Sequence, residues 1–91
     1  MGLKLSKLIW DEFNTAHIAK HHVTVNEVIE ACQTYISIDE TYGHRYLLVG
    51  KSKTGRLISV VLSKKLAGYY IVTARDSSRG ERKKAHDQKN K

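Results

Sequence analysis

The strongest constraint on the fold is a change of hydrophobic period at Tyr35, where helical spacing gives way to alternation of apolar and polar residues. Four short segments rich in aromatic and β-branched residues follow, as expected of strands. They cover residues 34–38, 45–52, 56–63 and 69–75 and are separated by turns that contain glycine. Short turns that contain glycine join neighbouring antiparallel strands. The second half of the chain therefore predicts a four-stranded antiparallel sheet.

Two helices are predicted before this sheet. Asp11 is placed as the N-cap of a helix that runs to about His21, and the apolar residues 8–10 ahead of it predict a short edge strand. The second helix begins at a capping box formed by Thr24 and Glu27. Its apolar stripe, at helical spacing and predicted to face the core, consists of Val25, Val28, Ile29 and Cys32.

The last strand runs into another capping box, Ser78 and Glu81, which predicts a C-terminal helix. Arg75 and Asp76 lie at the joint between this strand and this helix. There the Arg75 guanidinium and free helix amides could hold a phosphate, or Arg75 could pair with Glu81 and anchor the helix. Residues 86–91 have too little apolar content to pack, and we expect them to form a disordered tail.

Charge is distributed unevenly along the chain, whose net charge is +7. Residues 1–40 carry three lysines and six carboxylates, which gives −3. Residues 41–75 carry seven Lys or Arg and no Asp or Glu, which gives +7, and residues 76–91 add +3. A long segment without carboxylates indicates a polyanionic partner, and a generally basic surface kept soluble by its charge is the alternative.

Length and composition limit the class of protein. The 91 residues are enough for a single domain, residues 1–91, with a small core and an exposed site. The one cysteine, Cys32, allows no intrachain disulfide and no thiolate zinc site, and we expect it to be a small buried hydrophobe. No run approaches the ~18 apolar residues of a membrane span. We therefore expect a cytoplasmic protein that uses no metal and no small-molecule cofactor and does not contact the membrane.

Candidate acid–base groups lie at the end of the first helix. His17, Lys20 and His21 are spaced i, i+3, i+4 and share one helix face. Together they are a possible acid–base cluster, since one such side chain can accept a proton while another donates one. Helix C-termini also favour Lys and His because of the macrodipole, which is an ordinary structural explanation for the same residues.

Aromatic and basic side chains are mixed in the predicted sheet. Tyr46, Tyr69 and Tyr70 lie among cations, a combination that single-stranded RNA binding uses for stacking, although tyrosines on strands also pack in cores and rims. Arg56 alternates with apolar residues of its strand, so it lies at the open end of the strand or marks that face as the one that meets the substrate.

Several motifs together resemble the BrnT-type toxin family. The stretch "IWDEFNTAHIAKHHVTVNEVIEA" is similar to the opening of these toxins, and "RYLLVGKSKTGRLISVVL" and "YYIVTARDSSRGERK" are similar to their later part. The likeness runs from about Ile9 to Lys84. Its most specific elements are His17, Lys20-His21, Gly55-Arg56, Thr73-Ala74-Arg75 and Glu81-Arg82.

The resemblance implies an α+β, RelE-like fold: two N-terminal helices packed on a curved four-stranded antiparallel sheet, with a C-terminal helix. It implies the toxin of a type II toxin–antitoxin system, a metal-independent RNA endonuclease that inhibits translation, paired with a ribbon-helix-helix (BrnA-like) antitoxin. The expected catalytic residues are Lys20, His21, Arg45 and Arg75. The expected RNA-binding residues are Lys51, Lys53, Arg56, Tyr46, Arg79 and Arg82.

Two positions depart from the family pattern. His22 stands where glycine usually ends the first helix, and histidine bears strain in the left-handed conformation that glycine adopts there. Ala85 stands where many members have tyrosine, and His86 beside it is rotated by about 100° around a helix. The alternative is therefore a non-catalytic member that keeps the fold and binds only nucleic acid or an antitoxin.

Overall fold

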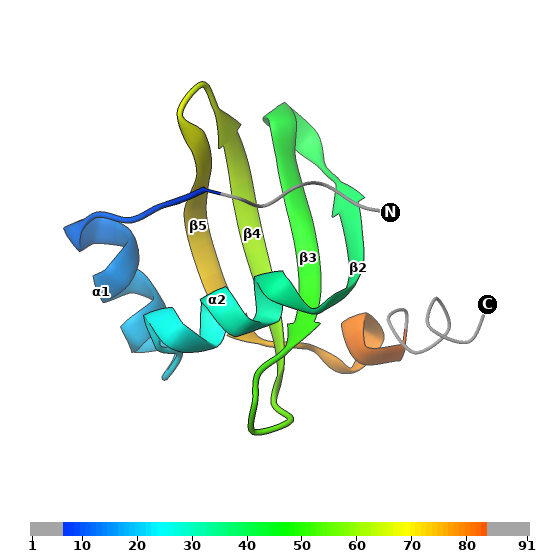
Figure 1. The fold of residues 1–91 in the computed structure, drawn as a ribbon. Helices are drawn as coiled ribbons and strands as arrows, with labels where there is room; N and C mark the ends of the chain where they lie inside the picture. The colour runs from blue at the N-terminus through cyan, green and yellow to red at the C-terminus, as the bar shows by residue number, and fades with distance from the viewer. Residues whose placement is uncertain (1–6, 84–91) are drawn as a thin grey trace.

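The computed structural model describes residues 7–83 of the 91-residue chain (Figure 1). Predictions that fall on residues 84–91, including the C-terminal tail, Ala85 and His86, lie outside the described residues. The elements in chain order are β1 (Leu8–Ile9), α1 (Glu12–Lys20), α2 (Val25–Gln33), β2 (Tyr35–Glu40), a 3-10 turn (Tyr42–His44), β3 (Arg45–Lys51), β4 (Leu57–Lys65) and β5 (Gly68–Asp76). Residues 79–83 are helical.

The sheet has five strands in the order β1-β5-β4-β3-β2. Strands β2 to β5 form the predicted antiparallel meander, which the structure confirms. The predicted count of four purely antiparallel strands is wrong, because β1 pairs in parallel with β5 and makes the sheet mixed. The main-chain N–H of Tyr69 donates to the Lys7 carbonyl at 2.9 Å and extends this pairing. The apolar residues 8–10 therefore supply the edge strand that they predicted.

Both long helices lie on one face of the sheet (Figure 1). Helix α1 packs against β5, and α2 packs against β3 and β4. The core between these layers includes side chains with no exposed surface from α2 and from three central strands. These are Val28, Ala31, Leu48, Ile58, Val60, Leu62, Ile71 and Ala74.

The start of α1 is fixed by reciprocal side-chain bonds. The Asp11 carboxylate accepts from the amides of Phe13 and Asn14, and the Asn14 side chain accepts from the Asp11 amide, all three at 2.9 Å. The predicted N-cap is therefore confirmed, within a capping box that uses Asn in place of Glu or Gln. Asn14 is buried and also donates to the Ile9 carbonyl, which ties α1 to β1.

The predicted capping box of α2 is confirmed, with Thr24 accepting from the Glu27 amide and Glu27 accepting from the Thr24 amide. Val28 and Cys32 are buried as the stripe predicts, and Val25 packs against the core. Ile29 was predicted to face the core, but it is only half-buried and lies outside the core cluster. Ala31 of the same helix belongs to that cluster. Burial raises the pKa of the Cys32 thiol to about 12, so this cysteine is a packed hydrophobe.

The surface of the sheet opposite α1 and α2 is called the second face below. Strand side chains alternate between faces, so the neighbours of buried core residues point to it. On β3 and β4 these include Arg45, Lys51, Ser59, Ser63 and Lys65. On β5 a register shift opposite Val61 and Leu62 places Tyr70 and Arg75 on the second face as well, opposite Ser63 and Ser59.

Gly50 permits the close approach of α2 to β3. A Cβ atom at this position would lie 2.1 Å from the main-chain oxygen of Ala31, a distance at which backbone must move. Gly50 is therefore required by the packing of two layers, whereas Gly80 has open space around its Cβ position.

We expect Gly50→Ala to lower the free energy of unfolding by about 1–3 kcal/mol, because α2 must shift away from β3. The matched control, Gly80→Ala, meets no neighbouring atom and has helical residues around it, so it should leave stability unchanged or raise it slightly. Urea unfolding followed by Trp10 fluorescence measures both variants. Equal stabilities of the two variants would contradict the observed contact between α2 and β3.

Candidate nucleic-acid interface

Arg75 pairs with Glu81 in a bidentate ion pair. Its two terminal nitrogens donate to the two carboxylate oxygens at 2.7 and 2.9 Å. Arg75 was predicted either to hold a phosphate or to pair with Glu81. The structure shows the pairing, which anchors the C-terminal segment. The Arg75 side chain remains partly exposed, with 40% of its surface accessible.

Glu81 connects the C-terminal segment to the second face. Its Oε1 accepts from the Ser59 hydroxyl at 2.9 Å and from the Ser78 amide at 2.8 Å, and Ser78 accepts in turn from the Glu81 amide. The predicted capping box is thus confirmed. The hydrogen bonds from Arg75, Ser78 and Ser59 hold the pKa of Glu81 at about 2, below its ordinary value of 4.5. Ser59 was not predicted, because no local motif reveals a partner 22 residues away.

Arg56 lies immediately before β4, and its guanidinium is bound by groups on β5, on α2 and in the turn between the two helices. It donates to the carboxylates of Asp76 and Glu27 and, at 2.7 Å, to the carbonyl of His22. These partners lie on the side of the sheet that α1 and α2 cover. Arg56 thus joins the ends of both helices to the sheet, and its predicted contact with RNA stays a prediction.

Lys20 and His21 lie at the C-terminal end of α1, with exposed side chains. His21 is the C-cap, and its ring lies 5.5 Å from that of His17. His22 has a φ of 60°, which confirms the expected left-handed residue after the helix. These residues are on the helix side of the sheet, whereas Arg45 and Arg75 are on the second face, so the structure does not gather the four predicted catalytic residues in one cluster.

Arg45 lies at the other end of the second face, in an open depression of about 430 Å³. The depression was not predicted as a unit, since it combines β3, β4, β5 and the N-cap of α1. Its lining consists of Asp11, Arg45, Ser63, Lys65, Tyr70 and Val72.

The three strand tyrosines of the basic segment lie on different faces. Tyr46 and Tyr69 pack against the core on the helix side and form an edge-on ring pair with centroids 6.3 Å apart. Tyr70 lies on the second face, and its hydroxyl donates to Asp11 at 3.0 Å. The second face therefore presents Tyr70, while the stacking role predicted for Tyr46 stays a prediction.

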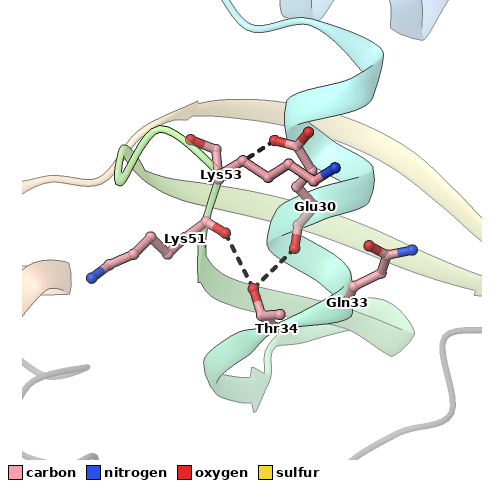
Figure 2. A pocket seen from close by; sticks show the side chains of 6 residues that line it. Glu30, Gln33, Thr34, Lys51 and Lys53 are labelled. Carbon is pink, nitrogen blue, oxygen red and sulfur yellow. Dashed lines mark hydrogen bonds between the residues drawn. The ribbon is translucent and has the colours of Figure 1, made fainter.

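Lys51 and Lys53 lie at the turn between β3 and β4, beside the end of α2 (Figure 2). A second open depression, of about 270 Å³, is lined there by residues that include Glu30 and Thr34. The Lys53 amide donates to Glu30, and the Thr34 hydroxyl donates to the Lys51 carbonyl. Figure 2 shows the Lys51 side chain extending away from α2, and this side chain is exposed.

Arg79 and Arg82, the last two residues of the predicted RNA-binding set, lie on the short helical segment 79–83 and are exposed. The Arg82 Nε donates to the Ser77 carbonyl at 3.1 Å. Within residues 7–83, no cluster of three or more His, Cys, Asp or Glu side chains is arranged to hold a metal ion. No helix in this same range has the length and apolar character needed to cross a membrane.

We expect stability to fall as the pH drops from about 5 to about 2, because the folded-state pKa of Glu81 lies below its unfolded value and protonation favours unfolding. In Glu81→Gln this loss should be smaller, since the titrating group is gone. The control Glu12→Gln removes an exposed carboxylate in the first turn of α1 and should retain the wild-type profile. Urea unfolding at several pH values measures the effect, and an unchanged profile in Glu81→Gln would contradict it.

Comparison with known proteins adds one finding on the fold. Neither protein-family models nor curated proteins match the chain. Among solved structures, the chain is similar to the ribonuclease toxin BrnT of Brucella abortus, known from a crystal structure at 1.1 Å resolution. The TM-score is 0.64 and the sequence identity 21%, over 79% of this chain and 96% of that toxin. The structural likeness agrees with the resemblance carried by the sequence motifs, and the chain has the fold of a BrnT-type toxin.

Proposed function

We propose that the protein is the toxin of a type II toxin–antitoxin system and acts in the cytoplasm as a metal-independent RNA endonuclease that inhibits translation. The likeness in fold to a ribonuclease toxin supports this proposal, as do the motifs distributed over most of the chain. The charge division along the sequence supports a polyanionic substrate independently of both.

The observation that carries the proposal is the presence of two cations without an ion pair, one at each end of β3 on the second face. Arg45 begins this strand and Lys51 ends it, about 20 Å apart at the usual rise of a strand. Both are exposed, and no side chain of residues 7–83 forms an ion pair with either. Such spacing suits an extended polyanion, since each cation can contact a different phosphate.

In the proposed reaction, Arg45 stabilises the negative charge that builds up on the phosphate as the 2′-hydroxyl attacks it. A guanidinium can donate two parallel hydrogen bonds to phosphate oxygens, which a lysine cannot do. Arg75 positions the C-terminal segment through Glu81 and is the second predicted catalytic arginine on this face. The acid and base roles of Lys20 and His21 stay predictions, since both lie on the helix side.

The proposed protein partner is a ribbon-helix-helix antitoxin of the BrnA kind. An inhibitor of this activity has to cover the cations of the second face or the residues beside them. Because these cations are exposed, association should be steered by charge and therefore slower at high salt.

A non-catalytic protein that binds RNA or an antitoxin is the second candidate function. The bidentate pairing of Arg75 with Glu81 favours it, because a guanidinium held by a carboxylate is not available to a phosphate in that arrangement. Cleavage assays on the purified chain separate the two candidates.

We expect the purified chain to cleave single-stranded RNA equally well with and without EDTA, and to leave a 2′,3′-cyclic phosphate on the 5′ fragment. The measurement is gel analysis of an end-labelled RNA, with mass spectrometry of the product ends. Cleavage that disappears in EDTA would overturn the metal-independent mechanism. RNA binding without any cleavage would favour the non-catalytic candidate.

Expression of the chain alone should stop bacterial growth, and Arg45→Ala should restore it. Arg45 is exposed and has no ion pair within residues 7–83, so its removal should leave the fold intact. The control Lys64→Ala removes an exposed cation on the side of the sheet opposite the second face and should stay toxic. Growth curves, with circular dichroism of both purified variants, provide the test. Toxicity that persists in a folded Arg45→Ala variant would contradict a role for Arg45.

A further inference from the structure

The depression that contains Arg45 is built by three neighbouring strands in register. Arg45 on β3 lies directly opposite Ser63 on β4, and Ser63 lies directly opposite Tyr70 on β5. Directly opposed residues bring their side chains within contact distance on one face. Lys65 follows two residues after Ser63 and points to the same side. A guanidinium, a hydroxyl, an ammonium group and an aromatic ring therefore converge on one open hollow.

The depression keeps a net positive charge, because its lining contains the two cations Arg45 and Lys65 and the single carboxylate Asp11. Asp11 lines the depression, but its Oδ1 accepts from the amides of Phe13 and Asn14 at the start of α1. Both of its carboxylate oxygens also lie within hydrogen-bond distance of the Tyr70 hydroxyl. Within residues 7–83, neither Arg45 nor Lys65 forms an ion pair. Two cations are thus available to a ligand while the carboxylate is engaged by the protein.

Tyr70 is oriented before any ligand arrives. Its hydroxyl is held by Asp11, which fixes the position of the half-buried side chain at the depression. Desolvation and the Asp11 carboxylate raise the pKa of Tyr70, so the hydroxyl keeps the proton that it donates. A preorganised aromatic ring costs little conformational entropy when a base stacks on it, and such stacking contributes ~1–3 kcal/mol per base.

We propose that this depression is a nucleotide-binding subsite for single-stranded RNA, in which Arg45 and Lys65 hold a phosphodiester and the Tyr70 ring contacts the attached base. The inference rests on the proposed function, and it names the part of the second face that holds the RNA chain. A hollow of about 430 Å³ matches one small ligand unit. The depression lies four residues along β4 from the opposed pair Ser59 and Arg75, which corresponds to about 13 Å. An RNA chain that contacts both places therefore spans more than one nucleotide.

The test compares Lys65→Gln with Lys64→Gln. The two lysines are adjacent on β4 and both exposed, and each variant loses one positive charge. Lys65 lines the depression, whereas Lys64 lies opposite Tyr69 on the other side of the sheet. Affinity for a fluorescein-labelled single-stranded RNA of about ten nucleotides is measured by anisotropy between ~50 and ~300 mM salt. Thermal unfolding of both variants checks that each is folded.

We expect Lys65→Gln to bind this RNA several-fold more weakly and to lower the slope of log affinity against log salt by about 0.7, the value for one lost phosphate contact on a single strand. Lys64→Gln should keep the wild-type affinity and slope. Equal effects of the two substitutions, or no effect of Lys65→Gln, would overturn the subsite while leaving RNA binding by the protein in place. If the unmodified chain does not bind the RNA, the proposed function itself fails, and the subsite fails with it.

Discussion

The burial of one sheet face beneath α1 and α2 is the constraint on which the rest of the structure depends. On β4, Ile58, Val60 and Leu62 are fully buried on this side. Because strand residues alternate, Ser59, Ser63 and Lys65 must then point to the second face. A slip of one residue would exchange the two sets and place serines and a lysine against the helices. Packing of the core therefore also decides which polar groups share the proposed RNA-binding surface.

One irregularity in this alternation changes the position of Arg75. Simple alternation from Tyr69 would place Arg75 on the same face as Ile71, beneath the helices. The register shift opposite Val61 and Leu62 reverses the phase, so that Ala74 is buried and Arg75 lies opposite Ser59 on the second face. Sequence periodicity cannot reveal a bulge of this kind, because the shift depends on pairing with β4 and leaves the composition of the strand unchanged.

Features determined by neighbouring residues could be predicted from the sequence, and features determined by long-range pairing could not. The capping boxes at Thr24 and Ser78, the Asp11 cap and the left-handed His22 all depend on a few adjacent residues, and the structure confirms them. The apolar residues 8–10 predict the edge strand β1, but its parallel pairing with β5, whose residues lie about 60 positions later, has no local signal. The depression around Arg45 likewise requires the register of three strands and the position of a helix cap.

The distribution of charged residues along the sequence overstates the positive charge that is available to a substrate. Residues 41–75 contain no carboxylate. In the part of the chain that the structure describes, however, two of the seven cations of this segment form ion pairs with carboxylates from outside it. Glu27 and Asp76 bind Arg56, and Glu81 binds Arg75. These pairs serve the fold, because they fasten the helix ends and the C-terminal segment to the sheet. Within residues 7–83, the cations of the second face that form no ion pair lie on β3 and at the β4–β5 hairpin. This moves the expected RNA contact from the strand-to-helix joint toward Arg45.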